Sequence, residues 1–315
     1  MGWQLLTRLG VLVLSLAAAS LLIFLVVQVL PGDPAQVVLG VNATPEALAK
    51  LRHQMGLDMP GWQRYLLWIG GVLHGDFGTS QVSGVPVAEL LRQKLSVSVP
   101  LALMGVAVSV LISVPLGMIA GVRYRHLSGT LISALSLGGI AIPAFWAALL
   151  LITVFAIRLR ALPAGGFVAW SDDPVAAFRS LLLPAISLGL VQGAILTRYV
   201  RSAIVDVLRE DYIRTARAKG LTRWQALRRH GFRNAAIPVV TVLGLQLTSL
   251  LVGAVVVENV FYLPGLGRML LQAIGNRDLI VIQATVMLLT GVVLLVNFIV
   301  EVSYRLLDPR IRATA

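Results

Sequence analysis

The 315-residue sequence contains no cysteine, and this absence removes several kinds of chemistry at once. Without cysteine there is no disulfide, no thiolate nucleophile and no sulfur ligand for a metal. The four histidines, His53, His74, His126 and His230, are scattered and lack the spacing of a metal site. We therefore expect them to be ordinary loop residues and predict no metal site in this chain.

Lysine is almost as scarce, and no phosphate-binding loop is present. Such a loop needs a lysine after glycine and before serine or threonine, so that the ammonium group meets the phosphates. None of Lys50, Lys94 and Lys219 follows a glycine. A Gly-x-Ser-x-Gly elbow and an aspartate pair within apolar segments are also absent, so nothing indicates intramembrane proteolysis. The sequence predicts that this chain is not an enzyme and binds no cofactor.

Charge is sparse as well: 13% of the residues are charged, whereas 57% are hydrophobic and the mean hydropathy is +0.87. A soluble domain cannot bury so much apolar surface, which indicates that the protein lies in a lipid bilayer. The net charge of +12 raises the possibility of a nucleic-acid partner. In a membrane protein, however, excess Lys and Arg usually lies in cytoplasmic loops, so we expect lipid contact and no nucleic acid.

Six stretches reach the roughly 20 residues that a helix needs to cross the hydrocarbon core. They run approximately over Leu9–Leu30, Ser98–Val122, Leu131–Ile157, Leu181–Val200, Ala235–Val257 and Leu279–Tyr304. Only helices satisfy their backbone polar groups at this length in lipid, so the predicted class is an all-α integral membrane protein with six spans. The first apolar run is longer than the roughly 7 to 15 residues of a cleaved signal, and we expect it to be retained.

The distribution of basic residues predicts the orientation. With the N-terminus in the cytoplasm, the inner segments hold 16 of the 26 Lys and Arg residues within about 65 positions, and the outer segments hold 10 within about 113. This difference in density favours both termini inside. We divide the chain into a first span at 1–30, an extracytoplasmic loop region at 31–97 and a five-helix core at 98–315, which includes a cytoplasmic loop at 201–235.

The long outer loop contains its own helix signals. Thr44-Pro45-Glu46 combines a capping hydroxyl, a proline for the first helical position and an early carboxylate, and Gly56 can end that helix. The following stretch, GWQRYLLWIG, carries Trp62, Tyr65 and Trp68, which suit a membrane interface. For this loop region we favour a packed cap on the outer face over a ligand site.

The segment Asp211–Pro238, DYIRTARAKGLTRWQALRRHGFRNAAIP, is strongly basic and lies between two apolar spans. Helical spacing would place Val205, Leu208, Tyr212 and Ala216 on one face. Gly220 is a natural helix end. Two further patterns follow it: Thr222 and Gln225 form a capping box, and Trp224, Leu227 and Gly231 would share a narrow face. The sequence thus predicts a helix, a glycine break and a second amphipathic helix.

Three interpretations of this segment compete. A basic amphipathic helix can lie on anionic lipid, a helix-turn-helix can read DNA, and a rigid protrusion can insert into a cytosolic partner. Tethering at both ends disfavours DNA binding, because it would hinder docking in a major groove. A lipid-surface helix needs no capped break at Gly220. We therefore favour the protrusion over the lipid-surface helix.

Several motifs, taken together with their order and spacing along the chain, resemble those of binding-protein-dependent ABC transporter permeases. The resemblance is closest to the first permease subunit of the dipeptide, oligopeptide and nickel family. These motifs are TARAKG, LRRH and AAIPVVTVLGLQ within Thr215–Gln246, GLDMPGWQRYLLWIGGVLHGDFGTS at Gly56–Ser80, PAFW at Pro143–Trp146, ENVFYLPGLGRML at Glu258–Leu270 and LLDPRIR at Leu306–Arg312. The general loop pattern of such permeases is E-A-A, three residues, Gly, nine residues and I-x-L-P. Aligned on Gly220, this chain has Arg214-Thr215-Ala216 and His230-Gly231-Phe232-Arg233 there, and its proline comes five residues late as Pro238. These departures fit the peptide and nickel subgroup.

The resemblance implies a type I importer-like fold in the bacterial cytoplasmic (inner) membrane, moving di- or oligopeptides inward by alternating access. It implies a second homologous permease subunit, two ABC ATPase subunits that hold ATP and Mg²⁺, and an extracytoplasmic solute-binding protein. The loop would couple to the ATPases through its central residues. The predicted coupling residues are Arg214, Thr215, Ala216, Lys219, Gly220, Leu221, Trp224 and Leu227.

Polar residues inside the spans are candidates for a substrate pathway, because burying them in lipid is unfavourable without partners. The candidates are Gln192, Gln246, Thr248, Asn297 and Glu301, together with Glu258 at the outer end of the fifth span. For each of the first five, an interhelical hydrogen bond is the simpler explanation. Glu258 fits either a gate that faces the binding protein or a simple loop cap. For the transported cargo, nickel or another small solute is the alternative to di- or oligopeptides. An ion-coupled secondary transporter would need ionisable residues deep in the spans, and most of these spans have none. A non-transporting scaffold would explain the basic loop but not the polar residues in the spans.

Overall fold

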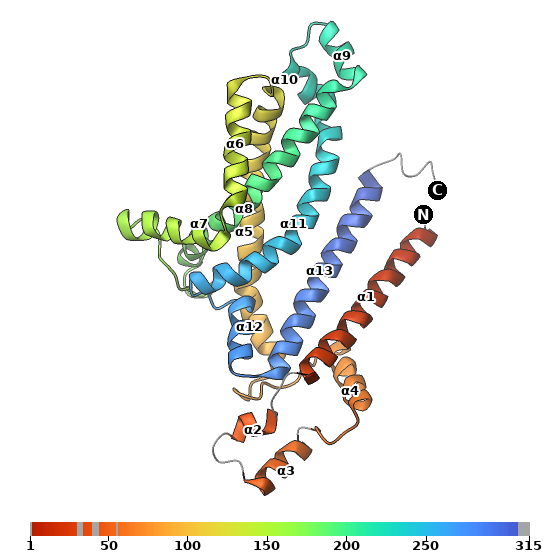
Figure 1. The fold of residues 1–315 in the computed structure, drawn as a ribbon, viewed down its shortest axis with the longest axis vertical. Coiled ribbons are helices and arrows are strands. Elements are labelled where there is room, and N and C mark those ends of the chain that lie inside the picture. Colours follow the sequence, from red (N-terminus) through yellow and green to blue (C-terminus); the bar gives the residue numbers. More distant parts are fainter. Residues whose placement is uncertain (1, 30–33, 40–43, 55, 308–315) are drawn as a thin grey trace. The chain divides into compact units, whose positions relative to one another are not determined.

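The computed structural model describes residues 2–29, 34–39, 44–54 and 56–307, and this part of the chain is helical without a β-strand (Figure 1). The helices are α1 (Gly2–Val29), α2 (Pro34–Leu39), α3 (Pro45–Gln54), α4 (Gly61–Leu73), α5 (Val87–Val122), α6 (Leu127–Ala141), α7 (Ala144–Leu151), α8 (Pro174–Arg209), α9 (Asp211–Ala218), α10 (Arg223–Ala226), α11 (Phe232–Val260), α12 (Leu266–Gly275) and α13 (Leu279–Leu307). Two π-helical segments, η2 (Ile152–Arg158) and η3 (Leu227–Gly231), follow α7 and α10. The predicted all-α class is confirmed. Pro31 and most of the terminal LLDPRIR motif lie outside the described residues.

Five helical segments are long and apolar enough to cross a membrane. They are Leu6–Val29, Val87–Val122, Pro174–Arg209, Arg223–Val260 and Leu279–Val302. A sixth candidate consists of Leu127–Ala141 and Ala144–Arg158, which are bent by 100° at a short break. Five to six candidate spans therefore agree with the six apolar stretches of the sequence.

The bend corrects one prediction, because Leu131–Ile157 does not form one straight helix. Ile142, between the two halves, has extended backbone angles of φ −85° and ψ 118°. The next residue, Pro143, disfavours the helical conformation of its predecessor and lacks an N–H for the ladder. The apolar stretch thus folds as an elbow of two short helices.

Two long helices begin earlier than the apolar stretches indicate. α5 starts at Val87, ahead of the expected Ser98, and it contains Pro100 and Pro115. α8 starts at Pro174, and the Asp173 carboxylate accepts hydrogen bonds from the N–H groups of residues 175 and 176 at 2.9 and 3.0 Å. A capping carboxylate followed by proline at the first position is a strong helix start. Polar first turns therefore extend helices beyond their apolar middles.

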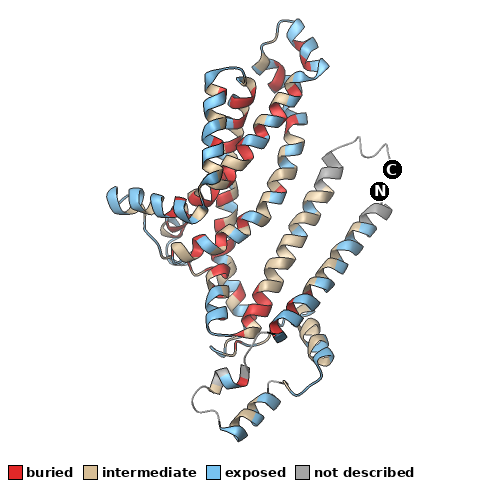
Figure 2. Ribbon diagram, in the orientation of Figure 1, coloured by how far each residue is buried: buried red, intermediate tan, exposed pale blue. Residues whose placement is uncertain are grey.

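The chain divides into two compact units, one of residues 1–97 and 265–295 and the other of residues 98–264 and 296–315. α5 and α13 each supply residues to both. In the second unit α8 is the central helix: it packs against α6, α7 and α11, and it contains 17 buried residues (Figure 2). This unit carries the basic segment.

Glycines allow α5 and α8 to approach closely within the second unit. A Cβ added to Gly117 would lie 2.5 Å from Val200 Cβ, and one added to Gly189 would lie 2.5 Å from Val108 Cβ. Gly117 begins a Gly-x-x-x-Gly pattern on α5, and Gly189 begins one on α8. Small residues at this spacing let membrane helices pack backbone to backbone. The bundle around α8 is held by this contact.

The first unit joins α1 to α4 through aromatic side chains. Phe24 lies 5.4 Å from the ring of Tyr65 and 6.2 Å from that of Trp68, between ring centroids, and Ser20 shares a hydrogen bond of 2.8 Å with the Tyr65 hydroxyl. Trp62 is exposed. Tyr65 and Trp68 of the predicted interfacial helix therefore pack against the first span.

The predicted helix start before α3 is also confirmed. Thr44 Oγ1 accepts a hydrogen bond from the N–H of Ala47 at 3.2 Å, with Pro45 as the first helical residue. Gly56 follows the helix with φ +63°, a conformation in which glycine has no Cβ penalty. Local sequence signals thus predicted this element correctly.

Candidate functional site

The candidate site is the basic segment between α8 and α11, which we call the coupling segment (residues 210–231). It begins with a break that the sequence did not predict. Glu210 has φ −64° and ψ 146°, so α8 ends at Arg209 and α9 begins at Asp211. The expected single helical face, which ran from Val205 through Tyr212 to Ala216, is therefore wrong because its members belong to two helices. The turn is what allows Ile213 of α9 to be fully buried in the second unit.

The break between α9 and α10 has the form that the sequence predicts. Gly220 has φ +95°, and its N–H donates to Arg217 O at 2.9 Å, which closes the last turn of α9. Thr222 Oγ1 then accepts from the N–H of Gln225 at 3.3 Å, and Gln225 Oε1 accepts from the N–H of Thr222 at 2.9 Å. This is a complete capping box, which satisfies two N–H groups at the start of α10. Both helix ends are thus fixed by local hydrogen bonds.

Buried apolar side chains hold the coupling segment against the end of α8. Ile213, Ala226 and Leu227 are fully buried and belong to one cluster with Val207 of α8. Gly231 completes the contact, since a Cβ there would lie 2.7 Å from Val207 Cγ1. Burying one large aliphatic side chain contributes about 1.5 to 3 kcal/mol. α9 and α10 are therefore packed onto α8 and do not project as isolated helices.

The structure divides the eight predicted coupling residues into two groups. Arg214, Thr215, Lys219, Gly220 and Trp224 are exposed, and Leu221 is half-buried. Ala216 and Leu227 are buried within the second unit. Of the three residues expected on one narrow face, Leu227 and Gly231 are buried, whereas Trp224 keeps 39% of its surface exposed. In this conformation Ala216 and Leu227 position the segment and do not themselves form its outer surface.

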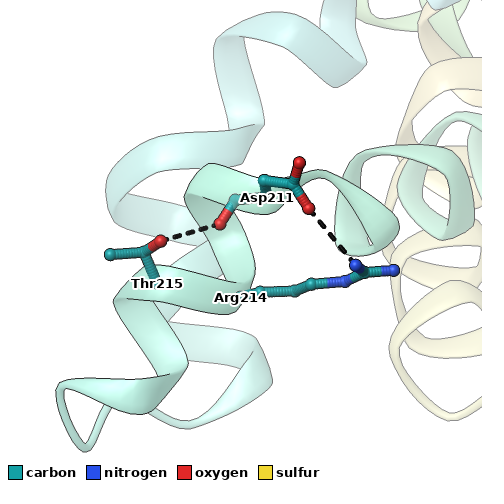
Figure 3. A network of polar contacts seen from close by, with 3 residues as sticks. All are labelled: Asp211, Arg214 and Thr215. Carbon is teal, nitrogen blue, oxygen red and sulfur yellow. Dashed lines mark hydrogen bonds and ion pairs between the residues drawn. The ribbon is translucent and has the colours of Figure 1, made fainter.

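The outer surface is basic and has few internal partners. Arg214 forms an ion pair of 3.2 Å with Asp211, and Thr215 Oγ1 donates to Asp211 O at 3.0 Å (Figure 3). Both charged side chains of that pair are largely exposed, so water screens it and its contribution to stability is small. The remaining exposed cations of the segment are Arg217, Lys219, Arg228 and Arg229. A partner with an acidic or polar groove would fit this surface.

The turn between α5 and α6 also belongs to the site, which sequence reasoning missed. The guanidinium carbon of Arg223 lies 5.6 Å from the centroid of the Tyr124 ring, and that of Arg125 lies 5.4 Å from the same ring. A cation over an aromatic face at this distance is favourable by about 0.5 to 1 kcal/mol at an exposed position. The basic and aromatic residues of the turn, RYR at Arg123–Arg125, were the available signal. Through this contact α10 is linked to a second pair of helices.

The predicted pathway residues do not form one cluster. Gln246 Nε2 donates to the backbone oxygen of Gln192 at 3.3 Å, so these two lie together between α8 and α11. Glu258 lies twelve residues further along α11, about 18 Å at the rise of a helix. It is buried and accepts a hydrogen bond from Ser98. The interhelical hydrogen bond expected as the simpler explanation is therefore present at Gln246, and Glu258 also forms one, with Ser98.

Three atoms among the candidates are buried without a hydrogen-bond partner in the described part of the chain: Gln192 Oε1, Thr248 Oγ1 and Asn297 Oδ1. Unsatisfied buried polar atoms are uncommon and costly. Gln192 combines such an atom with the nearby Gln246, so two amide side chains lie together within the spans of the second unit. Across the described residues, no group of three acidic, histidine or cysteine side chains could hold a metal ion.

Comparison with known proteins connects these features to a family. Residues 113–313 match the family described as the inner membrane component of binding-protein-dependent transport systems, and residues 1–101 match the N-terminal part of that membrane component. The coupling segment, the elbow and most of the second unit lie within the first match. This chain belongs to that family. It is a multi-pass protein of the inner membrane and a membrane subunit of a transport system.

Curated relatives extend over nearly the whole chain. The dipeptide transport system permease protein DppB of Escherichia coli (strain K12) is 37% identical over 331 aligned residues, which cover 98% of each chain. A candidate peptide transport system permease protein of Brucella abortus (strain 2308) is 38% identical over 93% of each chain. A peptide ABC transporter permease candidate of Sinorhizobium fredii is 36% identical over 99% of this chain and 100% of the relative. The resemblance noted from the sequence motifs is confirmed at the level of the family.

Proposed function

We propose that this chain is a permease subunit of an ATP-driven ABC importer that moves di- or oligopeptides into the cell by alternating access. The observation that carries the proposal is a capped and internally packed basic segment in a chain that aligns end to end with relatives named as peptide or dipeptide permeases. The peptide cargo is inferred from those names, and nickel or another small solute is the alternative.

The proposed topology has six spans, with the α6–α7 elbow counted as one and both termini in the cytoplasm. Within the second unit, the coupling segment and the turn of Arg123–Arg125 share one end, as the contact between Arg223 and Tyr124 shows. Asp172 and Asp173 lie at the other end of α8, about 54 Å away along this 36-residue helix. The higher density of basic residues at the coupling end supports a cytoplasmic location for the coupling segment. The proposed division into 1–30, 31–97 and 98–315 follows this topology.

The coupling segment is proposed to dock on one of two ABC ATPase subunits, with a homologous second permease beside this chain and a solute-binding protein on the outer face. This chain contributes no site for ATP or Mg²⁺ in this proposal, so both are held by the ATPase subunits. Trp224 and the exposed cations would contact the ATPase, while Ile213, Ala216 and Leu227 would transmit its movement to α8 through packing. Coupling of this kind requires an element with two arrangements that ATP biases.

Gln192 and Gln246 are the proposed polar contacts for a peptide backbone in the spans, with Thr248, Asn297 and Glu258 as weaker candidates. Amide side chains both donate and accept hydrogen bonds, which suits the alternating donors and acceptors of a peptide. Gln192 Oε1 is a buried acceptor that a peptide N–H would satisfy.

The experiment is peptide-dependent ATPase activity of the complex obtained by co-purifying this chain with its partners and adding the binding protein. Stimulation by di- or oligopeptides supports the cargo, whereas stimulation by Ni²⁺ alone would replace it with the metal. Co-purification without ATPase subunits would overturn the importer assignment itself. The isolated chain should neither bind nor hydrolyse ATP.

Single-cysteine crosslinking tests the docking separately. The sequence contains no cysteine, so cysteines placed at Lys219, Leu221 or Trp224 report only on these positions. Adducts with the ATPase that change with ATP support docking. Reaction with lipid reagents alone, in every nucleotide state, would favour the lipid-surface interpretation instead.

A further inference from the structure

Two adjoining cavities lie between α6 and α8, away from the coupling surface and from the Gln192–Gln246 pair. The larger has a volume of about 360 Å³ and is lined mainly by apolar side chains of α5, α6, α7 and α8 at the elbow, including Leu135, Ile142 and Leu190. The smaller, of about 90 Å³, is lined by Ser133, Ser136, Leu137, Thr197, Arg198 and Arg201. Ser136 and Thr197 line both. Together they form one groove, apolar at the elbow and cationic at the other end.

The cationic end lacks a counter-charge. Neither cavity is lined by an acidic residue, and neither Arg198 nor Arg201 has a carboxylate partner in the described parts of the chain. Arg201 Nε is buried without any hydrogen-bond acceptor there. A buried donor of a charged group with no acceptor is unfavourable, and the cost is recovered when a ligand supplies one. An anion bound at this end of the groove would supply the missing acceptor.

The three hydroxyl groups near the arginines donate their protons to backbone oxygens, and none of them accepts a hydrogen bond from Arg201 Nε. Ser133 Oγ donates to Gly129 O at 2.7 Å, Ser136 Oγ donates to Ile132 O at 2.9 Å, and Thr197 Oγ1 donates to Gly193 O at 2.6 Å. Their protons are thus turned toward their own helices. The guanidinium groups remain the donors that a ligand in the groove would meet.

The position of the arginines along α8 agrees with a membrane surface. Arg201 lies eight residues before the end of α8 at Arg209, about 12 Å at the helical rise. Long basic side chains near the end of a span extend toward the headgroup region. From Arg198 and Arg201 the groove leads in the opposite direction, past Thr197 to the apolar elbow at Ile142. Charge toward the surface and apolar lining toward the membrane interior is also the polarity of a phospholipid.

We propose that this groove binds an anionic phospholipid, with its phosphate on Arg198 and Arg201 and an acyl chain in the apolar cavity at the α6–α7 elbow. Basic pockets between membrane helices on the cytoplasmic side are suited to anionic headgroups. The lipid would stabilise the elbow, because its acyl chain fills the space between α7 and α8. This inference rests on the proposed topology, which puts this end of α8 at the cytoplasmic surface, and is independent of the cargo.

The test uses the full-length chain in nanodiscs that contain phosphatidylcholine with or without phosphatidylglycerol. The thermal midpoint and the number of retained lipids, measured by native mass spectrometry, are compared for the natural chain, the double variant Arg198→Gln/Arg201→Gln and the matched control Arg209→Gln. Arg209 is exposed, lies on the same helix and is absent from both cavity linings. The natural chain and Arg209→Gln should retain phosphatidylglycerol and gain several degrees from it. The double variant should bind it at least tenfold more weakly and gain nothing.

Two further variants separate the lipid from a merely structural effect. Arg198→Lys/Arg201→Lys keeps the charge and should retain part of the phosphatidylglycerol effect. Leu190→Trp fills the apolar cavity from a residue that is 39% exposed, and it should lower lipid retention while both arginines stay in place. In phosphatidylcholine alone, the double glutamine variant should be as stable as the natural chain, because it removes an unpaired buried donor.

Three results would overturn the proposal. The first is an equal loss in Arg209→Gln, which would show nonspecific attraction of anionic lipid to the basic end. The second is retained phosphatidylglycerol in the double glutamine variant. The third comes from photocrosslinking with an acyl-labelled phosphatidylglycerol: adducts on α6 and α8 that disappear whenever the second permease is present would show that the groove is a protein interface.

Discussion

Ser98 of α5 donates a hydrogen bond of 2.5 Å to Glu258 Oε1 of α11, and both side chains are buried. The two residues are 160 positions apart in the sequence and join two long helices at the end of the second unit opposite to the coupling segment. Glu258 is only 1% exposed. The carboxylate is therefore closed off from solvent in this conformation, and its hydrogen bond joins α5 to α11 at this end.

The first prediction concerns this pair. Ser98→Ala should lower the thermal midpoint of the solubilised chain, with a loss of about 1 to 3 kcal/mol, because it removes a donor from a buried acceptor. Ser98→Thr keeps the hydroxyl and is the matched control. If the outer end opens during transport, Ser98→Ala should also raise the peptide-independent ATPase activity of the assembled complex. Unchanged stability in Ser98→Ala would contradict a stabilising role for this hydrogen bond.

The second prediction concerns the contact between α11 and α13 in the second unit. A Cβ added to Gly244 would lie 2.6 Å from Val300 Cγ1, too close for any real side chain. Gly244→Ala should therefore destabilise the chain by about 1 to 3 kcal/mol through overpacking. Val300→Ala in the same chain should restore part of the loss, because it removes both Cγ atoms but keeps the Cβ, which lies 2.9 Å from the added atom. Gly138→Ala on α6, where nothing lies within 4 Å, should be neutral or slightly stabilising.

The third prediction concerns the buried Asp278 in the first unit. Its carboxylate accepts from Ser80 Oγ at 2.5 Å and from the N–H of Val281 at 3.3 Å, so it holds the loop before α5 against the start of α13. Asp278→Ala should open this loop, which proteolysis or hydrogen exchange of residues 79–86 would detect as lost protection. Asp58→Ala, at an exposed loop position, is the comparison. Equal protection in both variants would contradict the assigned role.

Local signals explain which features were predictable. The capping box of Thr222 and Gln225, the positive φ of Gly220 and the start of α3 each depend on residues within a few positions of one another. The overall helical class follows from the length of the apolar runs. These features needed no knowledge of which helices are neighbours.

Contacts between distant residues explain what the sequence did not reveal. Leu227 has the spacing of an exposed amphipathic face, yet Val207 and Ile213 bury it, and those residues belong to two other helices. Pro143 is a local signal for the elbow, but the continuous apolar stretch on both sides of it predicts one uninterrupted span. The link of Ser80 to Asp278 spans 198 positions and has no local sign at all.

The fourth prediction isolates the backbone of the coupling segment. Gly220→Val and Gly220→Asn both add a side chain where nothing lies within 4 Å, so they differ mainly in how well they tolerate φ +95°. Asn adopts positive φ far more readily than a β-branched residue, for which the strain is about 1 kcal/mol or more. Gly220→Val should reduce peptide transport and ATPase association, and Gly220→Asn should retain most of both. Equal defects would indicate that the side-chain surface matters instead of the backbone angle.

The last prediction separates the outer surface of the coupling segment from its interior. Trp224 is 39% exposed, so Trp224→Ala should leave the thermal midpoint of the chain nearly unchanged while weakening association with the ATPase subunits. Leu227 is fully buried, so Leu227→Ala should cost about 2 to 5 kcal/mol by leaving a cavity, and its transport defect should follow from that instability. Leu227→Met conserves volume and should restore stability and association together, since such swaps cost little in a packed core. Arg228→Gln serves as the charge comparison, because the lipid-surface interpretation predicts that its defect depends on anionic lipid content. A Trp224→Ala variant that binds the ATPase as the natural chain does, measured by co-purification in detergent, would place the docking surface elsewhere on this segment.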